Sequence, residues 1–154
     1  MNITYLKTGE KKDVIIELVK DPDYKGIKKN KYHFNWNGEK SNTVFKLRLL
    51  DDKEILGLVS LKEFPTEKRI EISLLASSVD NTGKNKIYEG IAGALIAHAC
   101  REAIKLFAID ACVSLTPKTK LKKHYIEKYG MKDAGKQVYL DLDCIINFVN
   151  KYEI

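Results

Sequence analysis

One stretch constrains the fold of this chain more than any other, the apolar run from Gly90 to Cys100. It predicts a helix from about Ile87 to about Phe107 that is apolar on nearly all sides, so other elements must cover its surface. The mostly apolar run from Ala108 to Leu115 then predicts a strand buried on both faces. With a strand predicted over Arg69–Ala76, these segments make a strand–loop–helix–strand crossover, whose two strands should be parallel neighbours in a sheet.

Shorter patterns on either side complete a mixed fold. An irregular, aromatic-rich segment is expected over Tyr24–Asn42. Three other helices are predicted. The first spans Lys12–Lys20 and is ended by Asp21-Pro22. The second begins at Lys118, after Thr116-Pro117, and ends at Gly130 in a left-handed conformation, and the third spans Asp143–Tyr152. The other predicted strands are Val44–Leu50, Ile55–Phe64 and a hairpin over Met131–Leu142 that turns at Ala134–Lys136. We therefore expect one α+β domain over residues 1–154, with α/β/α layers around a mixed, mostly antiparallel sheet.

Charge and cysteine usage narrow the partners and the compartment. The net charge is +6, which would attract a ligand that carries several phosphates. Arginine occurs only at Arg48, Arg69 and Arg101, which argues against sequence-specific nucleic-acid binding. The three cysteines are far apart in the sequence and favour buried thiols in a reducing compartment, with no disulfide framework and no metal site. The apolar run is too short to cross a bilayer and no signal peptide is evident, so we expect a cytoplasmic protein that does not bind membranes.

The start of the central helix is the predicted ligand site. In open sheets, ligands bind beyond the carboxyl ends of parallel strands, where the crossover helix begins. Gly90, Ala92 and Gly93 lack bulk there, and amides in the first turn of a helix attract phosphate. Lys84 and Lys86 add positive charge nearby. Small residues at a helix start also serve close packing on a sheet, and that alternative stays open.

The hexapeptide Ile87-Tyr88-Glu89-Gly90-Ile91-Ala92, together with the order of elements over Val44–Leu142, resembles the GNAT superfamily of acyl-CoA-dependent N-acetyltransferases. The signature of that family at this helix start is Gln or Arg, two residues, Gly, one residue, then Gly or Ala. Ile87 takes the first position here, and the stretch from Ala76 to Ile87 is longer than the family usually shows. The resemblance implies acetyl-CoA as cofactor and transfer of its acyl group to a primary amine by direct attack in a ternary complex.

The resemblance also implies which residues form the site. Leu75, Ala76 and Ser77 would bind the pantetheine arm, and the pyrophosphate would lie against the helix start. The implied cofactor-binding residues are Leu75, Ala76, Ser77, Lys84, Lys86, Tyr88, Glu89, Gly90, Ile91, Ala92 and Gly93. Glu89 is a discordant carboxylate in this set, and we expect it to point toward solvent.

The resemblance implies that Tyr125 protonates the departing thiolate, with Tyr129 as the alternative acid, although Tyr125 also fits a core aromatic. A base is expected because the attacking amine must be neutral. Glu71 is the candidate base and Glu63 the alternative, although a glutamate on a strand usually belongs to a solvated face. His98 is expected to be a core residue. Cys100 and Cys112 are placed in core elements, which makes them poor nucleophiles.

The acceptor amine is not identified by the sequence. The Tyr24–Asn42 segment and the hairpin near Gly135 would build its site, with Tyr32, Phe34 and Trp36 as candidate lining residues that could instead pin the segment to the core. A homodimer built through the terminal hairpin or helix is one plausible assembly. The alternative function is a catalytically weak, GNAT-like module that binds acyl-CoA, a protein or a polyanion, and Ile87 and the long loop before it motivate this reading.

Overall fold

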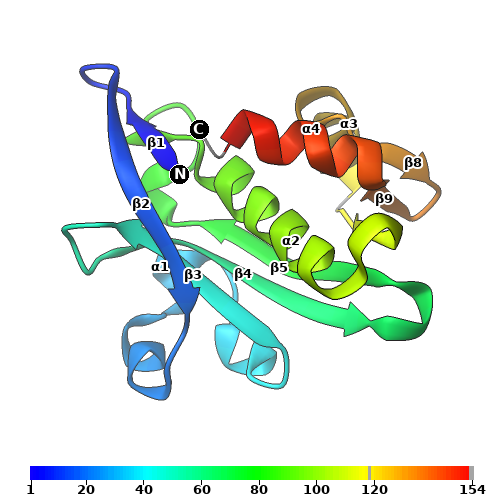
Figure 1. Cartoon of the computed structure of the whole chain (residues 1–154). Helices are drawn as coiled ribbons and strands as arrows, with labels where there is room; N and C mark the ends of the chain where they lie inside the picture. Colours follow the sequence, from blue (N-terminus) through cyan, green and yellow to red (C-terminus); the bar gives the residue numbers. More distant parts are fainter. Residues whose placement is uncertain (118, 153–154) are drawn as a thin grey trace. The chain divides into compact units, whose positions relative to one another are not determined.

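The computed structural model describes residues 1–117 and 119–152 (Figure 1). These residues form two compact units. The first unit consists of Met1–Ser60 and Leu74–Leu95, and the second of Leu61–Ser73 and residues 96–152. Strands β4 (Ile55–Phe64) and β5 (Arg69–Ser77) and helix α2 (Ile91–Phe107) each contribute to both units. No helix in the described ranges has both the length and the apolar character needed to cross a membrane.

The described strands form a single mixed sheet in the order β6-β1-β2-β3-β4-β5-β7-β9-β8. The remaining strands are β1 (Asn2–Tyr5), β2 (Glu10–Leu18), β3 (Thr43–Leu49), β6 (Tyr88–Glu89), β7 (Cys112–Leu115), β8 (Lys132–Ala134) and β9 (Gln137–Leu140). Strands β5 and β7 run parallel, from Arg69↔Cys112 to Ile72↔Leu115, whereas the hairpin β8–β9 and the β1–β2–β3 strands are antiparallel. The predicted α+β class and the parallel pair across the crossover are therefore confirmed.

The prediction of a helix over Lys12–Lys20 is wrong, because most of this segment belongs to strand β2, which ends at Leu18. Strand β2 pairs with β1 on one side and with β3 on the other. Val14, Ile15 and Ile16 are consecutive β-branched residues, which lose side-chain freedom in a helix and fit a pleated strand. Their apolar spacing matches a helix only by coincidence, and the strand is stabilised by its two neighbours.

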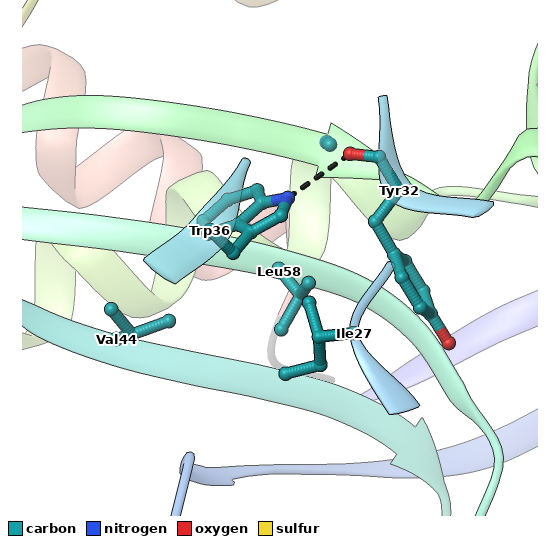
Figure 2. Packing of buried hydrophobic residues seen from close by; sticks show 6 residues of the cluster. Ile27, Tyr32, Trp36, Val44 and Leu58 are labelled. Atoms are coloured by element: carbon teal, nitrogen blue, oxygen red, sulfur yellow. Dashed lines mark hydrogen bonds between the residues drawn. The ribbon is translucent and has the colours of Figure 1, made fainter. Parts of the chain in front are cut away.

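The segment over Tyr24–Asn42 is largely irregular, as predicted, and its aromatic residues fix it to the first unit. It contains one helical turn, α1 (Lys29–Tyr32), between 3₁₀ turns at Asp21–Gly26 and Trp36–Glu39. Trp36 is fully buried and donates a hydrogen bond from Nε1 to the carbonyl of Tyr32 at 3.0 Å (Figure 2). Tyr32 is buried as well, and its hydroxyl donates to the carbonyl of Ile55 at 2.8 Å. Both rings therefore belong to the core around Leu58 and do not line an acceptor pocket.

Helix α2 begins four residues later than predicted, at Ile91, because Tyr88 and Glu89 pair with β1 as strand β6. The expectation that the helix is covered on nearly all sides is confirmed. Its buried residues are Ile91, Gly93, Ala94, Leu95, Ile96, Ala97, Ala99, Cys100 and Ala103. The strand after it is shorter than predicted, since Ala108–Asp110 form a 3₁₀ turn before β7.

The rest of the second unit follows the sequence prediction closely. Helix α3 (Lys122–Tyr129) ends at Gly130, which has φ of 68° in the left-handed region, and the β8–β9 hairpin turns at Gly135 with φ of 80°. The predicted helix start at Lys118 lies outside the described residues. Helix α4 (Leu142–Tyr152) packs against β7 and β9 through its buried residues Ile145 and Phe148.

Candidate functional site

The N-terminus of α2 presents backbone amides that the helix itself cannot satisfy. The first helical hydrogen bond runs from the amide of Ala94 to the carbonyl of Gly90, at 2.9 Å. The amides of Ile91, Ala92 and Gly93 precede that bond, so their acceptors must come from outside the helix. Gly90 has φ of 103°, a conformation that is strained for residues with a side chain. Together with the helix dipole, these amides form a surface suited to an anion such as phosphate.

The end of β5 lies in the same unit as this helix start. The recorded pairing of β5 with β7 ends at Ile72↔Leu115, and β5 continues to Ser77. On the side of β4 the chain stays hydrogen-bonded, since the amide of Ser78 donates to the carbonyl of Leu56 at 2.8 Å. Leu75, Ala76 and Ser77 therefore follow the last recorded β7 pair, where an extended ligand could pair with the strand.

Gly57 brings β4 close to both of these features. A Cβ atom added at Gly57 would lie 2.6 Å from Cγ2 of Ile91 and 3.2 Å from the carbonyl oxygen of Ala76. The bare backbone thus lets the strand end and the helix start approach each other closely. Sequence reasoning missed Gly57, and its one signal is a glycine inside a strand, which often marks a close approach.

Contacts made by the loop before α2 change which of the predicted groups can bind phosphate. The amide of Tyr88 donates to Oδ1 of Asn81 at 2.9 Å, so this amide is used inside the protein. Nζ of Lys86 and Oε2 of Glu89 form an ion pair at 2.5 Å, so the lysine charge offsets the carboxylate at this helix start. Lys84 is exposed, and Ile87 is 44% exposed. Among the amides predicted to bind phosphate, those of Ile91, Ala92 and Gly93 precede the first helical hydrogen bond, and the exposed Lys84 lies in the loop before them.

The two predicted catalytic residues lie in the second unit. Tyr125 of α3 is half-buried, and burial raises the pKa of its phenol, so the hydroxyl keeps its proton at neutral pH. The alternative acid, Tyr129, is buried, with its ring centroid 5.8 Å from that of Phe148. Tyr129 is therefore a core aromatic, and Tyr125 is the more accessible of the two.

Glu71 takes part in a side-chain network centred on Arg69. Nη1 of Arg69 donates to Oε2 of Glu71 at 3.1 Å and to Oγ of Ser114 at 2.9 Å. The guanidinium also lies 3.9 Å from the ring centroid of Phe64. Glu63, the alternative base, is exposed on β4. The network holds Glu71 in one position on β5 and engages one of its two carboxylate oxygens.

The remaining reactive side chains fit structural roles. Burial raises the pKa of the Cys100 thiol to about 12 and also raises that of Cys112, so neither is an effective nucleophile. His98 is mostly buried, with its side chain 12% exposed, and its Nε2 lies 3.6 Å from Oε1 of Glu102. Within residues 1–117 and 119–152, no group of three or more His, Cys, Asp or Glu side chains is arranged to hold a metal ion.

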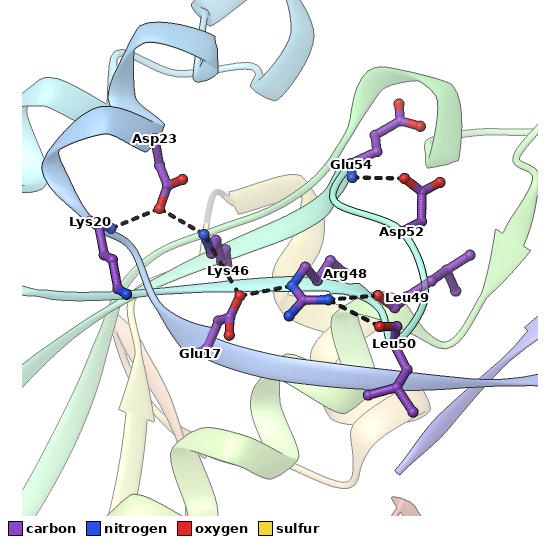
Figure 3. Close-up of polar contacts among 9 residues, drawn as sticks. All are labelled: Glu17, Lys20, Asp23, Lys46, Arg48, Leu49, Leu50, Asp52 and Glu54. Atoms are coloured by element: carbon purple, nitrogen blue, oxygen red, sulfur yellow. Dashed lines mark hydrogen bonds and ion pairs between the residues drawn. The ribbon is translucent and has the colours of Figure 1, made fainter.

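A second polar cluster, on β2 and β3, also has a structural role. Arg48 donates from Nε to Oε1 of Glu17 at 2.8 Å, and Lys46 contacts Asp23 at 2.7 Å (Figure 3). The hydrogen bond from Arg48 lowers the pKa of Glu17. These pairs line a shallow hollow of about 390 Å³, and they tie the 3₁₀ turn at Asp21–Gly26 to the sheet.

Comparison with known proteins gives a match in fold. No protein-family model and no curated protein matches the chain in sequence. Among solved structures, spermidine N-acetyltransferase from Vibrio cholerae, in a dodecameric structure, superposes with a TM-score of 0.64 and 15% identity, over 87% of this chain and 96% of the other. A GNAT family acetyltransferase from Elizabethkingia anophelis with acetyl-CoA bound has a TM-score of 0.61 and 13% identity, over 84% and 98%.

This chain has the GNAT fold. The ribosomal-protein-S18-alanine N-acetyltransferase from Escherichia coli shares it as well, with a TM-score of 0.57 and 12% identity, over 82% of this chain and 91% of the other. The GNAT resemblance seen in the sequence is thereby confirmed at the level of fold.

Proposed function

We propose that this protein is an acetyl-CoA-dependent N-acetyltransferase that transfers the acetyl group to a primary amine by direct attack in a ternary complex. The observation that carries the proposal is the start of α2 in a GNAT fold. There, three successive amides precede the first helical hydrogen bond, beside small residues and a left-handed Gly90. Ala92 and Gly93 carry no side chain larger than a methyl group, which would let a pyrophosphate approach the backbone.

The proposed cofactor site uses backbone groups of the first unit. The amides of Ile91, Ala92 and Gly93 bind the pyrophosphate, and Lys84 adds attraction. The edge of β5 at Leu75–Ser77, beyond the last pair with β7, binds the pantetheine arm as an added strand, and one of its amides polarises the thioester carbonyl. Such a contact contributes on the order of 3 kcal/mol of transition-state stabilisation. When bound, acetyl-CoA supplies the electrophilic thioester carbon.

The proposed proton transfers use side chains of the second unit. Oη of Tyr125 holds the proton that the departing sulfur takes up, because burial raises the pKa of this phenol and keeps it protonated at pH 7. A carboxylate oxygen of Glu71 accepts the proton of the amine, directly or through water, while Arg69 holds the other oxygen.

The first experiment is a thermal melt with acetyl-CoA, with CoA, and with ATP as a phosphate-bearing control. A ligand at about a hundred times its Kd should stabilise the protein by roughly 2.7 kcal/mol, a shift of several degrees. We expect both CoA species to raise the Tm and ATP to have little effect. No shift at millimolar ligand would refute the cofactor site.

A transfer assay with radiolabelled acetyl-CoA then tests the reaction. The amine panel should include spermidine and a peptide with N-terminal alanine, since proteins of this fold act on such acceptors. Labelled product with any primary amine supports the enzyme. Tight cofactor binding without transfer to any amine would instead favour an acyl-CoA-binding module, the reading that the apolar Ile87 at the signature position motivates.

A further inference from the structure

We propose that Asn81 is a positioning residue that shapes the phosphate-binding end of α2 by tying the two ends of the loop 78–88 together. Its predicted effect on cofactor affinity rests on the proposed function. Its geometric basis is independent of that function and can be tested without any ligand.

The side chain of Asn81 joins both ends of this loop. Its Nδ2 donates to Oγ of Ser78 at 2.9 Å, and its Oδ1 accepts from the amide of Tyr88 at 2.9 Å. Asn81 is only 6% exposed, and Ser78 is 2% exposed. A buried amide group with both of its ends bonded holds its partners more firmly than an exposed one, because water does not compete for them.

The loop ends that Asn81 joins are themselves fixed to the sheet. Ser78 donates its amide to Leu56 of β4, and the carbonyl of Ile87 accepts from the amide of Leu6 at 3.0 Å. Between these ends the outer part of the loop, residues 82–85, is exposed. Thr82 adds one more internal bond, from its Oγ1 to the carbonyl of Ser78 at 2.9 Å.

Asn81 supplies a polar contact that the side chain at position 87 cannot make. The side chain of Ile87 is apolar and exposed, so this side chain neither donates nor accepts a hydrogen bond at the helix start. The amide of Tyr88, two residues before Gly90, is instead directed inward by Asn81. This bond sets the path on which the chain enters the left-handed Gly90 and the first turn of α2.

Asn81 should therefore affect the binding of the cofactor and not the chemical step. Without Asn81 the loop would sample more conformations, and the cofactor would have to order it on binding. We expect Asn81→Ala to raise the Kd for CoA, measured by calorimetry, about tenfold, and Ser78→Ala, which leaves the Tyr88 bond in place, about threefold. The kcat at saturating acetyl-CoA should stay within about twofold of the unchanged protein.

Asn35→Ala is the matched control, because Oδ1 of Asn35 accepts from the amide of Asn37 at 3.2 Å in another loop of the first unit. This variant should leave the Kd for CoA unchanged. An equal loss of affinity in Asn35→Ala and Asn81→Ala would overturn the proposal, as would an unchanged Kd in Asn81→Ala. Should Asn81→Ala fold poorly, the Kd for CoA of Ser78→Ala is compared with that of Asn35→Ala instead.

Hydrogen exchange measured by NMR without ligand separates the two proposals. Asn81→Ala should speed exchange of the Tyr88 amide at least about tenfold, while Ala94 in α2 keeps its protection. Asn81→Asp retains the acceptor oxygen and should restore protection at Tyr88. If CoA fails to bind the unchanged protein while this exchange pattern holds, the proposed function is refuted and the positioning by Asn81 is supported. If CoA binds but Tyr88 is equally protected in Asn81→Ala, the positioning proposal is refuted and the function stands.

Discussion

At the scale of single residues, His98 should make the protein sensitive to acid. Burial lowers the pKa of His98 to about 4, against an ordinary value of 6.5. As the pH falls below that ordinary value, the unfolded chain takes up a proton at His98 and the folded chain does not, so folding stability is lost between these two values. The expected loss from pH 7 to pH 5 is about 2 kcal/mol, measured by urea unfolding.

Two glutamine substitutions test this assignment. His98→Gln should remove most of the loss between pH 7 and pH 5, whereas the same change at the exposed His124 should leave it intact. An equal pH dependence in all three proteins would assign the acid sensitivity to other groups.

Tyr125 and Tyr129 offer a matched pair for the proposed acid. Tyr125→Phe should lower kcat about a hundredfold, the usual contribution of a general acid, and leave the Kd for CoA unchanged. Tyr129→Phe should retain kcat, because that ring serves the core beside Phe148. Steady-state kinetics with the best amine of the panel would measure both. A larger loss of kcat in Tyr129→Phe would move the acid to Tyr129.

At the scale of elements, Gly57 controls how closely α2 approaches β4. Gly57→Ala places a methyl group 2.6 Å from Ile91 Cγ2 and 3.2 Å from a backbone oxygen, so the helix start must shift. We expect a destabilisation of about 1–3 kcal/mol by urea unfolding, together with weaker CoA binding. Gly38→Ala is the control, since an added Cβ there meets nothing within 4 Å. Wild-type CoA affinity in Gly57→Ala would show that the helix start tolerates displacement.

Elements that are defined by a long apolar run or by a glycine at a turn can be predicted well from the sequence. The apolar run of α2 predicts its end correctly and its start to within four residues, and Gly130 and Gly135 turn the chain where expected. Strand β2 is missed because its identity depends on pairing with β1 and β3, which no local pattern reveals. The roles of Gly57 and Asn81 in the site are missed for the same reason, since each acts through partners brought near by the fold.

At the scale of the whole molecule, β4, β5 and α2 couple the two units through the chain itself. Each of these elements contributes residues to both units, so unfolding of one unit would disrupt elements of the other. We expect one cooperative unfolding transition in urea, as for most single domains of this size. The fluorescence of Trp36, the single tryptophan, reports on the first unit, and hydrogen exchange in β7 and β9 reports on the second. Two separated midpoints would contradict the prediction of a single domain.

The pairing of β1 with β6 bears on how the protein is made. Strand β1 leaves the ribosome before any other described strand, but its partner residues Tyr88 and Glu89 follow about eighty residues later. The β1–β2 hairpin can form at once, whereas the edge that supports the start of α2 must wait for this distant contact. A nascent chain halted before residue 88 therefore has its N-terminal hairpin but no cofactor-binding end. During synthesis, the proposed cofactor site would therefore be completed only after β1 to β5 have left the ribosome, and before β7, β8 and β9 follow.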